Sequence, residues 1–324
     1  MRVDDLGCAD VRNDRSIQKS VTTKTRYDSK IDVDVNQKIR QEERNNRSVS
    51  RIFRSRNKEI VLGEKTLVMA IVNITPDSFS DGGKYLETEQ IVTRVADLLT
   101  LGADIIDVGG ESTRPGYEPV SADQEWDRLR EPLFALRSTW PNLCLSVDTQ
   151  KAWVAEQAVK AGVSIVNDIW GLSGDRDMAR VVADSGAGLV MMFNRQPSWN
   201  SGEVNIAEMI KFFVRQIQRA GESGISCDHI LVDPGLGFGY GVEDNWVVLR
   251  HLEEFQGLGA GLLLGPSRKR FLGSVSGKPP QERDGATAAV CALAAAKGVD
   301  VMRVHNVEQV ADALRVSDAW YRHV

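Results

Sequence analysis

Polar side chains stand at the ends of several short apolar runs in this sequence, where they could do chemistry. Asp148, Asn167 and Asp233 each close such a run. A carboxylate among apolar residues is costly unless something pairs with it. Carboxylates accept hydrogen bonds and an amide both donates and accepts, so the three could together bind a flat heterocycle rich in N–H and carbonyl groups. A structural salt bridge, for example with Lys269, is the alternative interpretation.

A second group of polar residues is cationic and suits a different ligand. Guanidinium groups bind phosphate through two parallel hydrogen bonds, and an ammonium binds it as a point charge. The loops after the last two strands of an α/β barrel are a frequent phosphate site. For Arg268 and Lys269 an ordinary solvated pair is the alternative. The sequence otherwise predicts an anion site, above all for phosphate or diphosphate, formed by Arg114, Ser267, Arg268, Lys269, Arg303 and His305.

The remaining chemistry-bearing residues point to magnesium rather than to zinc or a nucleophile. No cluster has the spacing of zinc ligands, and no Cys or Ser stands beside a His in a nucleophile pattern. Mg²⁺ prefers oxygen ligands and keeps several waters. Asn73 ends the first apolar run, and its side chain with a diphosphate could hold Mg²⁺. The sequence is therefore compatible with an Mg²⁺ site that includes Asn73.

The elements that must position these residues alternate from about residue 57 onwards. Eight short apolar runs alternate with eight helical patterns. Continuous apolar runs of this length are typical of parallel strands buried on both faces. Eight such pairs favour an α/β fold, a (β/α)8 TIM barrel, whose active site lies at the C-terminal ends of the strands. An open doubly wound sheet is the alternative, but residues 73–77 replace the glycine-rich turn it normally carries.

The N-terminal part of the chain differs from the rest. Residues 1–50 are polar and, on balance, basic, with no convincing period, so we expect a disordered N-terminal extension. Residues 58–74 predict an N-terminal hairpin that leads into a buried strand. The expected division is therefore an extension, 1–50, and one barrel domain, 51–324. A basic arm can bind nucleic acid or a membrane surface, but the acidic residues mixed through this one argue against both.

Composition narrows the protein class further. The sequence has no run of about 18 apolar residues that could span a membrane, and its first residues lack the apolar core of a signal peptide. The four cysteines are scattered without a C-x-x-C pair, which fits a reducing cytoplasm. We expect a cytoplasmic protein that acts on small molecules, with no nucleic-acid or membrane partner.

Seven motifs resemble one known family, dihydropteroate synthase. They are NITPDSFSDGG (73–83), IIDVGGESTRPG (105–116), SVDT (146–149), IVNDI (165–169), DPGLGFG (233–239), SRKRFLG (267–273) and RVHNV (303–307). They occur in the family's order and on its strand ends, and the resemblance covers about Arg54 to the C-terminus. The first two motifs are highly specific, and the later ones support them.

This resemblance implies a reaction and its setting. The family joins 7,8-dihydropterin-6-ylmethyl diphosphate to 4-aminobenzoate, which gives 7,8-dihydropteroate and diphosphate in folate biosynthesis. It is a transferase on a (β/α)8 barrel, works with Mg²⁺, is usually a homodimer and is the target of sulfonamides. The family is thought to pass through a pterin-methyl cation. The resemblance therefore implies pterin binding, this dissociative transfer and a homodimer for the present chain.

Site residues follow from the resemblance motif by motif. The implied pterin contacts are Asp148, Asn167, Asp233 and Lys269, and the implied diphosphate contacts are Arg303 and His305. Asn73 is the implied metal ligand, and the implied catalytic residues are Asp81, Lys269, Arg303 and His305. The full implied substrate site comprises Phe79, Thr113, Arg114, Pro115, Asp148, Asn167, Met192, Asp233, Phe238, Ser267, Arg268, Lys269, Arg303 and His305.

One segment, VNITPDSFSDGG (72–83), combines turn-forming residues with an aromatic ring. A surface loop whose Phe79 tucks under the barrel edge is the plain interpretation. In the implied mechanism the loop closes over the cation and keeps water out, because water would hydrolyse it. Asp81 would offset the positive charge and Phe79 would wall the aminobenzoate slot.

Three positions depart from the family pattern, and two rival functions remain. Phe193 stands where His is usual, Tyr240 where many members have Lys, and Asn306 where Asp is common. We expect Phe193 to alter the depth of the pterin pocket through its neighbour Met192. The first rival is a pterin-binding methyltransferase of the same superfamily, which has no need for the diphosphate-binding cations. The second is a catalytically weak paralogue that binds pterin, and the missing histidine is its only support.

Overall fold

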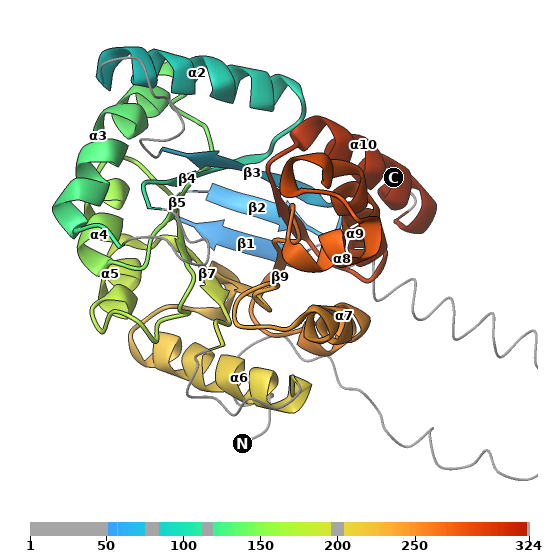
Figure 1. Ribbon diagram of the computed structural model, residues 1–324. Coiled ribbons are helices and arrows are strands. Elements are labelled where there is room, and N and C mark those ends of the chain that lie inside the picture. The colour runs from blue at the N-terminus through green and yellow to red at the C-terminus, as the bar shows by residue number, and fades with distance from the viewer. Residues whose placement is uncertain (1–50, 57, 75–83, 112–118, 196–203, 323–324) are drawn as a thin grey trace, which may run out of the picture.

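The computed structural model describes residues 51–56, 58–74, 84–111, 119–195 and 204–322, with only the backbone of 84–87 (Figure 1). The predicted extension, 1–50, lies outside these ranges. Five predicted site residues also lie outside them: Phe79, Asp81, Thr113, Arg114 and Pro115.

Eight parallel strands close into a barrel, which confirms the predicted (β/α)8 fold. The ring closes where β10 pairs in parallel with β3. The strands are short and wholly or mostly buried, as the continuous apolar runs predicted. In chain order they are β3 (Leu67–Asn73), β4 (Ile105–Gly109), β5 (Leu145–Asp148), β6 (Ile165–Asp168), β7 (Gly188–Met192), β8 (Ile230–Asp233), β9 (Gly261–Leu264) and β10 (Val301–Val304).

Helices form the outer ring around this barrel (Figure 1). They are α2 (Lys84–Thr100), α3 (Ala122–Thr139), α4 (Ala152–Lys160), α5 (Met178–Ser185), α6 (Ile206–Glu222), α7 (Val242–Arg250), α8 (Arg270–Ser276), α9 (Asp284–Ala296) and α10 (Val307–Tyr321), with 3₁₀ turns η4 (Cys227–His229), η5 (Leu252–Phe255) and η6 (Pro280–Glu282). Helix α8 was not predicted, because seven residues are too few to show a helical period. In the described part of the chain no helix is long and apolar enough to cross a membrane.

An antiparallel hairpin precedes the barrel, and it begins one strand earlier in the chain than the sequence indicated. Strand β1 (Arg51–Ser55) pairs with β2 (Lys58–Leu62), whereas the hairpin was expected within 58–74. The strand β1 was missed because its charged residues resemble the polar arm. A Cβ added to Gly188 would lie 2.5 Å from the Phe53 ring, and one added to Gly261 would lie 2.6 Å from Leu62. These glycines begin β7 and β9, so the hairpin covers the N-terminal end of the barrel.

Strand alternation separates an apolar barrel floor from a polar mouth. Successive side chains on a strand point to opposite faces, so residues two apart share a face. Val301 and Leu231 belong to the apolar cluster that packs on the hairpin. Two residues further along the same strands stand Arg303 and Asp233, which line a cavity at the opposite end. The fold therefore gathers its polar residues at the C-terminal ends of the strands.

Candidate active site

A small cavity lies at the mouth of the barrel and is lined largely by the predicted residues. It also contains apolar wall residues that the sequence did not single out, Ile169 and Leu236, and the backbone of Gly265. The predicted residues brought together here are Asn167, Met192, Asp233, Phe238, Lys269 and Arg303.

Arg303 is held between two buried carboxylates. Its Nε donates to Asp107 Oδ2 at 2.6 Å and its Nη2 donates to Asp148 Oδ2 at 2.6 Å. Burial opposes the charge, but the two carboxylates outweigh it and hold the pKa of Arg303 above its ordinary value. The salt bridge considered for Asp148 exists, with Arg303 rather than Lys269 as the partner.

Asp107 is a site residue that the sequence reasoning missed. Its side chain is fully buried on β4, and its Oδ2 also accepts a 3.1 Å hydrogen bond from Asn167 Nδ2. A charged residue within the apolar run IIDVGG was the signal that could have found it. Asp107 thus joins Arg303 and Asn167, from three strands, in one buried network.

Two carboxylate oxygens of this network accept no hydrogen bond from the described residues. Within the described residues, Oδ1 of Asp148 and Oδ1 of Asp107 are buried and have no hydrogen-bond partner. Burial raises the pKa of Asp148 to about 7; Arg303 works against this shift and Asp107 adds to it. A buried acceptor without a partner is costly, so the barrel mouth is suited to a ligand that brings N–H donors.

Asp233 and Lys269 form the other side of the cavity. Asp233 accepts from the backbone N–H of Gly235 at 2.8 Å, and burial raises its pKa to about 6. Burial lowers the pKa of Lys269 to about 8; Arg303 adds to this, while Asp233 and Asp148 oppose it. The Lys269 Nζ lies 4.1 Å from the centroid of the Phe238 ring, a cation–π distance. The structure therefore places a carboxylate, an ammonium and an aromatic face around one opening.

Of the other predicted anion-binding residues, the three that the structure describes are engaged with their neighbours. Ser267 Oγ lies 2.9 Å from His305 Nδ1, which links β9's end to β10's end. The guanidinium of Arg268 makes two hydrogen bonds to Asp284, at 2.7 and 2.8 Å. Asn306 donates to the same carboxylate at 2.9 Å, a bond that an ionised Asp at this position would not make. Arg268 is thus held by Asp284 and is not part of the cavity lining; its role in substrate binding stays a prediction.

The side chain of Phe193 lies outside the pocket. Its ring packs against Phe212 at a centroid distance of 5.1 Å and against Tyr240 at 6.3 Å, and it belongs to the apolar layer between barrel and helices. Met192, the preceding residue, lines the cavity instead. Because neighbouring strand residues face opposite ways, Phe193 does not itself line the pocket, and its effect on the pocket depth stays a prediction.

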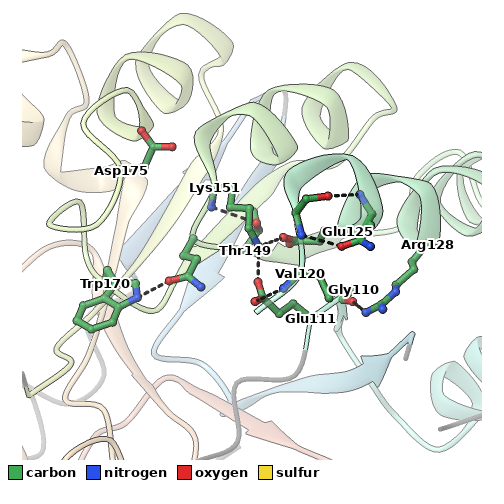
Figure 2. A network of polar contacts seen from close by, with 12 residues as sticks. Gly110, Glu111, Val120, Glu125, Arg128, Thr149, Lys151, Trp170 and Asp175 are labelled. Carbon is green, nitrogen blue, oxygen red and sulfur yellow. Dashed lines mark hydrogen bonds and ion pairs between the residues drawn. The ribbon is translucent and has the colours of Figure 1, made fainter. Parts of the chain in front are cut away.

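A second charged network, also missed from the sequence, lies beside the barrel mouth (Figure 2). Lys151 Nζ donates to Glu125 Oε2 at 2.5 Å and to Glu111 Oε2. Glu111 Oε1 accepts from the backbone N–H of Val120 at 3.2 Å, and both carboxylates are buried. The network ties the end of β4 to the start of α3 and to the residues that follow Asp148.

Replacing Lys151 with methionine is expected to destabilise the fold by about 3–5 kcal/mol, because it leaves two buried carboxylates without their cation. Urea unfolding followed by circular dichroism measures the change. The control is Lys160→Met, since its pair with Glu156 is exposed and should contribute little to stability. Equal midpoints for the two variants would show that the Lys151 network contributes nothing to stability.

Known proteins resemble this chain in sequence and in structure. Residues 69–305 match the family described as pterin binding enzyme. The dihydropteroate synthase of Bacillus subtilis strain 168 is 45% identical over 256 residues, which are 79% of this chain and 89% of that protein. The crystal structure of the Clostridium difficile dihydropteroate synthase in the presence of pteroic acid superposes with a TM-score of 0.77 at 41% identity, covering 81% of this chain and 98% of that one.

A second similar structure is of a complex with 4-aminobenzoic acid, one of the two substrates that the resemblance implies. The Xanthomonas albilineans dihydropteroate synthase with 4-aminobenzoic acid has a TM-score of 0.78 at 37% identity, and covers 84% of this chain and 98% of that chain. Sequence identity of this level over nearly the whole barrel leaves no doubt about descent. The chain belongs to the dihydropteroate synthase family of pterin-binding enzymes.

Proposed function

We propose that this protein is a dihydropteroate synthase, a transferase that joins 7,8-dihydropterin-6-ylmethyl diphosphate to 4-aminobenzoate in folate biosynthesis. The observation that carries the proposal is the polar barrel mouth: Asp148, Asn167, Asp233, Lys269 and Arg303 from five different strand ends or loops. The relatives support it, since their solved structures contain pteroic acid and 4-aminobenzoic acid.

The pterin is held by buried acceptors and by the ammonium. Asp148 and Asp233 are suited to accept from pterin N–H groups, and Asn167 can both donate and accept. Lys269 is suited to donate to the pterin carbonyl. Arg303 keeps Asp148 in place through their 2.6 Å bond. These groups orient the methylene carbon toward the open side of the barrel mouth.

The transfer replaces a C–O bond with a C–N bond. The methylene–diphosphate bond breaks, the diphosphate leaves with the bonding electrons, and the amine nitrogen of 4-aminobenzoate then attacks the pterin-methyl cation and loses a proton. Fixed positive charge stabilises a departing anion; here the Ser267–His305 pair and Arg303 stand on adjacent strand ends. We assign the diphosphate to Ser267, His305 and Arg303, and keep Arg268 as an outer contact.

The protein ligands present fit a magnesium ion that arrives with its substrate. The described residues contain no cluster of three His, Cys, Asp or Glu side chains that could hold a metal. Asn73 ends β3 opposite Gly109 and makes no side-chain hydrogen bond within the described part of the chain, so it offers one free amide oxygen. Mg²⁺ accepts such a ligand set when phosphate oxygens and water complete it. When bound, Mg²⁺ would neutralise charge on the departing diphosphate.

Two loops complete the site in this proposal. Phe79 and Asp81 belong to the segment 75–83, and Thr113, Arg114 and Pro115 to the segment 112–118. We assign Phe79 and Pro115 to the aminobenzoate slot, Thr113 and Arg114 to the diphosphate side, and Asp81 to the charge of the cation. Sulfonamides, as mimics of 4-aminobenzoate, should compete for the same slot.

Diphosphate release tests the proposed function directly. The enzyme should release diphosphate from the pterin diphosphate quickly when 4-aminobenzoate is present, and dihydropteroate should form in equal amount. Pterin binding without any release would favour the weak paralogue. Methyl transfer from methyltetrahydrofolate, with no dihydropteroate formed, would favour the methyltransferase.

Pterin affinity should follow a bell-shaped pH profile in the ligand-free protein. Burial raises the pKa of Asp148 to about 7 and of Asp233 to about 6, and burial lowers that of Lys269 to about 8. Ionised carboxylates accept from the pterin, so affinity should rise from pH 5 to 7. A neutral Lys269 loses its charge-assisted bond, so affinity should fall above pH 8. Calorimetric dissociation constants from pH 5 to 9.5 measure this, and a flat profile would contradict it.

A homodimer is the assembly that the C-terminal helices favour. Helices α8, α9 and α10 lie next to one another (Figure 1), and each carries at least one large apolar side chain that is exposed. These side chains are Val275, Leu293, Val316 and Trp320, each between 68% and 74% exposed. Exposed apolar side chains on neighbouring helices can together form an association surface, and self-association through one face gives a two-fold dimer.

Trp320→Glu should shift this protein toward a monomer in light scattering during gel filtration, because it places a charge on the proposed dimer face. Phe134→Glu, at a half-exposed apolar residue of α3, serves as the control and should leave the mass unchanged. A wild-type protein of monomer mass at working concentration would reject the dimer. We propose a cytoplasmic location for the reaction, as the sequence predicted.

A further inference from the structure

Two of the three positions that depart from the family pattern contact one another. The rings of Phe193 and Tyr240 are stacked, with centroids 6.3 Å apart and planes at 13°. Phe193 follows β7 and Tyr240 follows β8, and both side chains are buried. The pair therefore spans two adjacent strands on the outer side of the wall that carries Asp233.

Tyr240 also fixes the segment between Asp233 and itself. Its hydroxyl donates to the carbonyl oxygen of Pro234 at 2.9 Å and lies 3.7 Å from the sulfur of Met209. The donor is buried and reaches back across the turn, so the bond joins the two ends of the segment 234–240. Phe193 holds the start of the same segment, because its backbone N–H donates to the carbonyl oxygen of Asp233 at 2.9 Å.

The segment so held is the wall of the cavity. Leu236 and Phe238 line it together with Asp233. The turn is tightly packed. Gly235 has φ +75°, and a Cβ there would lie 1.9 Å from the Phe193 carbonyl oxygen. A Cβ on Gly237 would lie 2.8 Å from Lys269 Cδ. A small shift of the segment therefore moves the Asp233 carboxylate, the Phe238 ring and the Lys269 side chain together.

We propose that Tyr240, braced by Phe193, is a positioning residue that sets the pterin side of the site by locking the Asp233–Phe238 wall. Neither side chain touches the cavity, so the pair acts only through that wall. The proposal rests on the proposed function for the identity of the ligand. It predicts that the two departures act as one unit and govern pterin affinity rather than aminobenzoate affinity.

The test removes one oxygen atom. Tyr240→Phe keeps the stacked ring and deletes only the bond to Pro234, which leaves that buried carbonyl unpaired. We expect the dissociation constant for the pterin diphosphate to rise about tenfold, the size of one buried hydrogen bond, while the KM for 4-aminobenzoate changes less than about twofold. Tyr321→Phe, on the exposed end of α10, is the matched control and should match the wild type. Calorimetry at 25 °C, with folding checked by circular dichroism, gives the binding values.

A double-mutant cycle with Phe193→Leu tests the coupling. If the two side chains form one unit, the double variant should bind pterin only slightly more weakly than the worse single variant. If the factors by which the two single variants raise the dissociation constant multiply in the double variant, the two positions act independently and the proposed coupling is wrong. Unchanged pterin affinity in a folded Tyr240→Phe protein would overturn the positioning role, even with a lowered melting temperature. Failure of the wild type itself to bind pterin would instead reject the proposed function.

Discussion

Replacing Arg303 with methionine is expected to cost this protein both its stability and its activity. The guanidinium of Arg303 bridges Asp107 and Asp148 at 2.6 Å each, and Asp107 is fully buried. Without the bridge two carboxylates stand unpaired in the barrel mouth. Removing one partner of a buried ion pair costs about 3–5 kcal/mol, and turnover should fall at least about 100-fold with the loss of fixed positive charge.

The pH dependence of the Arg303→Met protein checks this cause. Asp148 already has a pKa raised to about 7 by burial, and without its cation the charged form is still less favourable. The penalty is present above that pKa and vanishes as the carboxylate takes a proton. The variant should therefore lose less stability at pH 5 than at pH 8, as measured by urea unfolding at both values.

Two further variants separate charge balance from chemistry. The triple variant Arg303→Met, Asp107→Asn, Asp148→Asn should regain much of the stability and stay inactive. Arg180→Met, at an exposed arginine of α5 paired with Asp184, should change neither property. A stable, active Arg303→Met protein would remove the arginine from both the network and the site.

Much of this site was predictable because the barrel places strand ends together. The alternation of apolar runs and helical patterns predicted the barrel. Asp148, Asn167 and Asp233 each end an apolar run, so in a barrel they had to lie on the same rim. Spacing along the chain could not reveal which side chains pair across the barrel. That is why Asp107 was missed and why Arg303, rather than Lys269, is the partner of Asp148.

Residues whose side chains face away from the cavity were the hardest to interpret. Phe193 looked like a pocket residue because it follows Met192, but one residue along a strand changes the face. No regular spacing in the sequence relates Lys151 to Glu111 and Glu125, because their ion pairs join three separate parts of the fold. The strand β1 and helix α8 are short, so tertiary contacts such as Phe53 on the barrel floor decide them rather than local pattern.

Replacing Lys269 with methionine should show the opposite balance to Arg303: a large loss of activity without a loss of stability. Burial lowers the pKa of Lys269 to about 8, and the carboxylates Asp233 and Asp148 compensate only in part. The folded protein thus holds this ammonium at a cost. A lowered lysine pKa means that the folded state gains stability as pH rises from 8 toward 10.5, and the variant should lack that gain.

Activity should fall by about two orders of magnitude in the Lys269→Met protein, as for other lost electrostatic donors. The ammonium stands over the Phe238 ring at 4.1 Å and lines the same cavity as Asp233 and Arg303, so its loss should weaken pterin binding as well as turnover. Lys278→Met, at an exposed residue after α8, is the control. Steady-state kinetics and urea unfolding on the same samples decide the matter. Near-normal turnover would remove Lys269 from the site, whereas a destabilised protein would show that its ammonium is paired in the folded state, as Arg303 is.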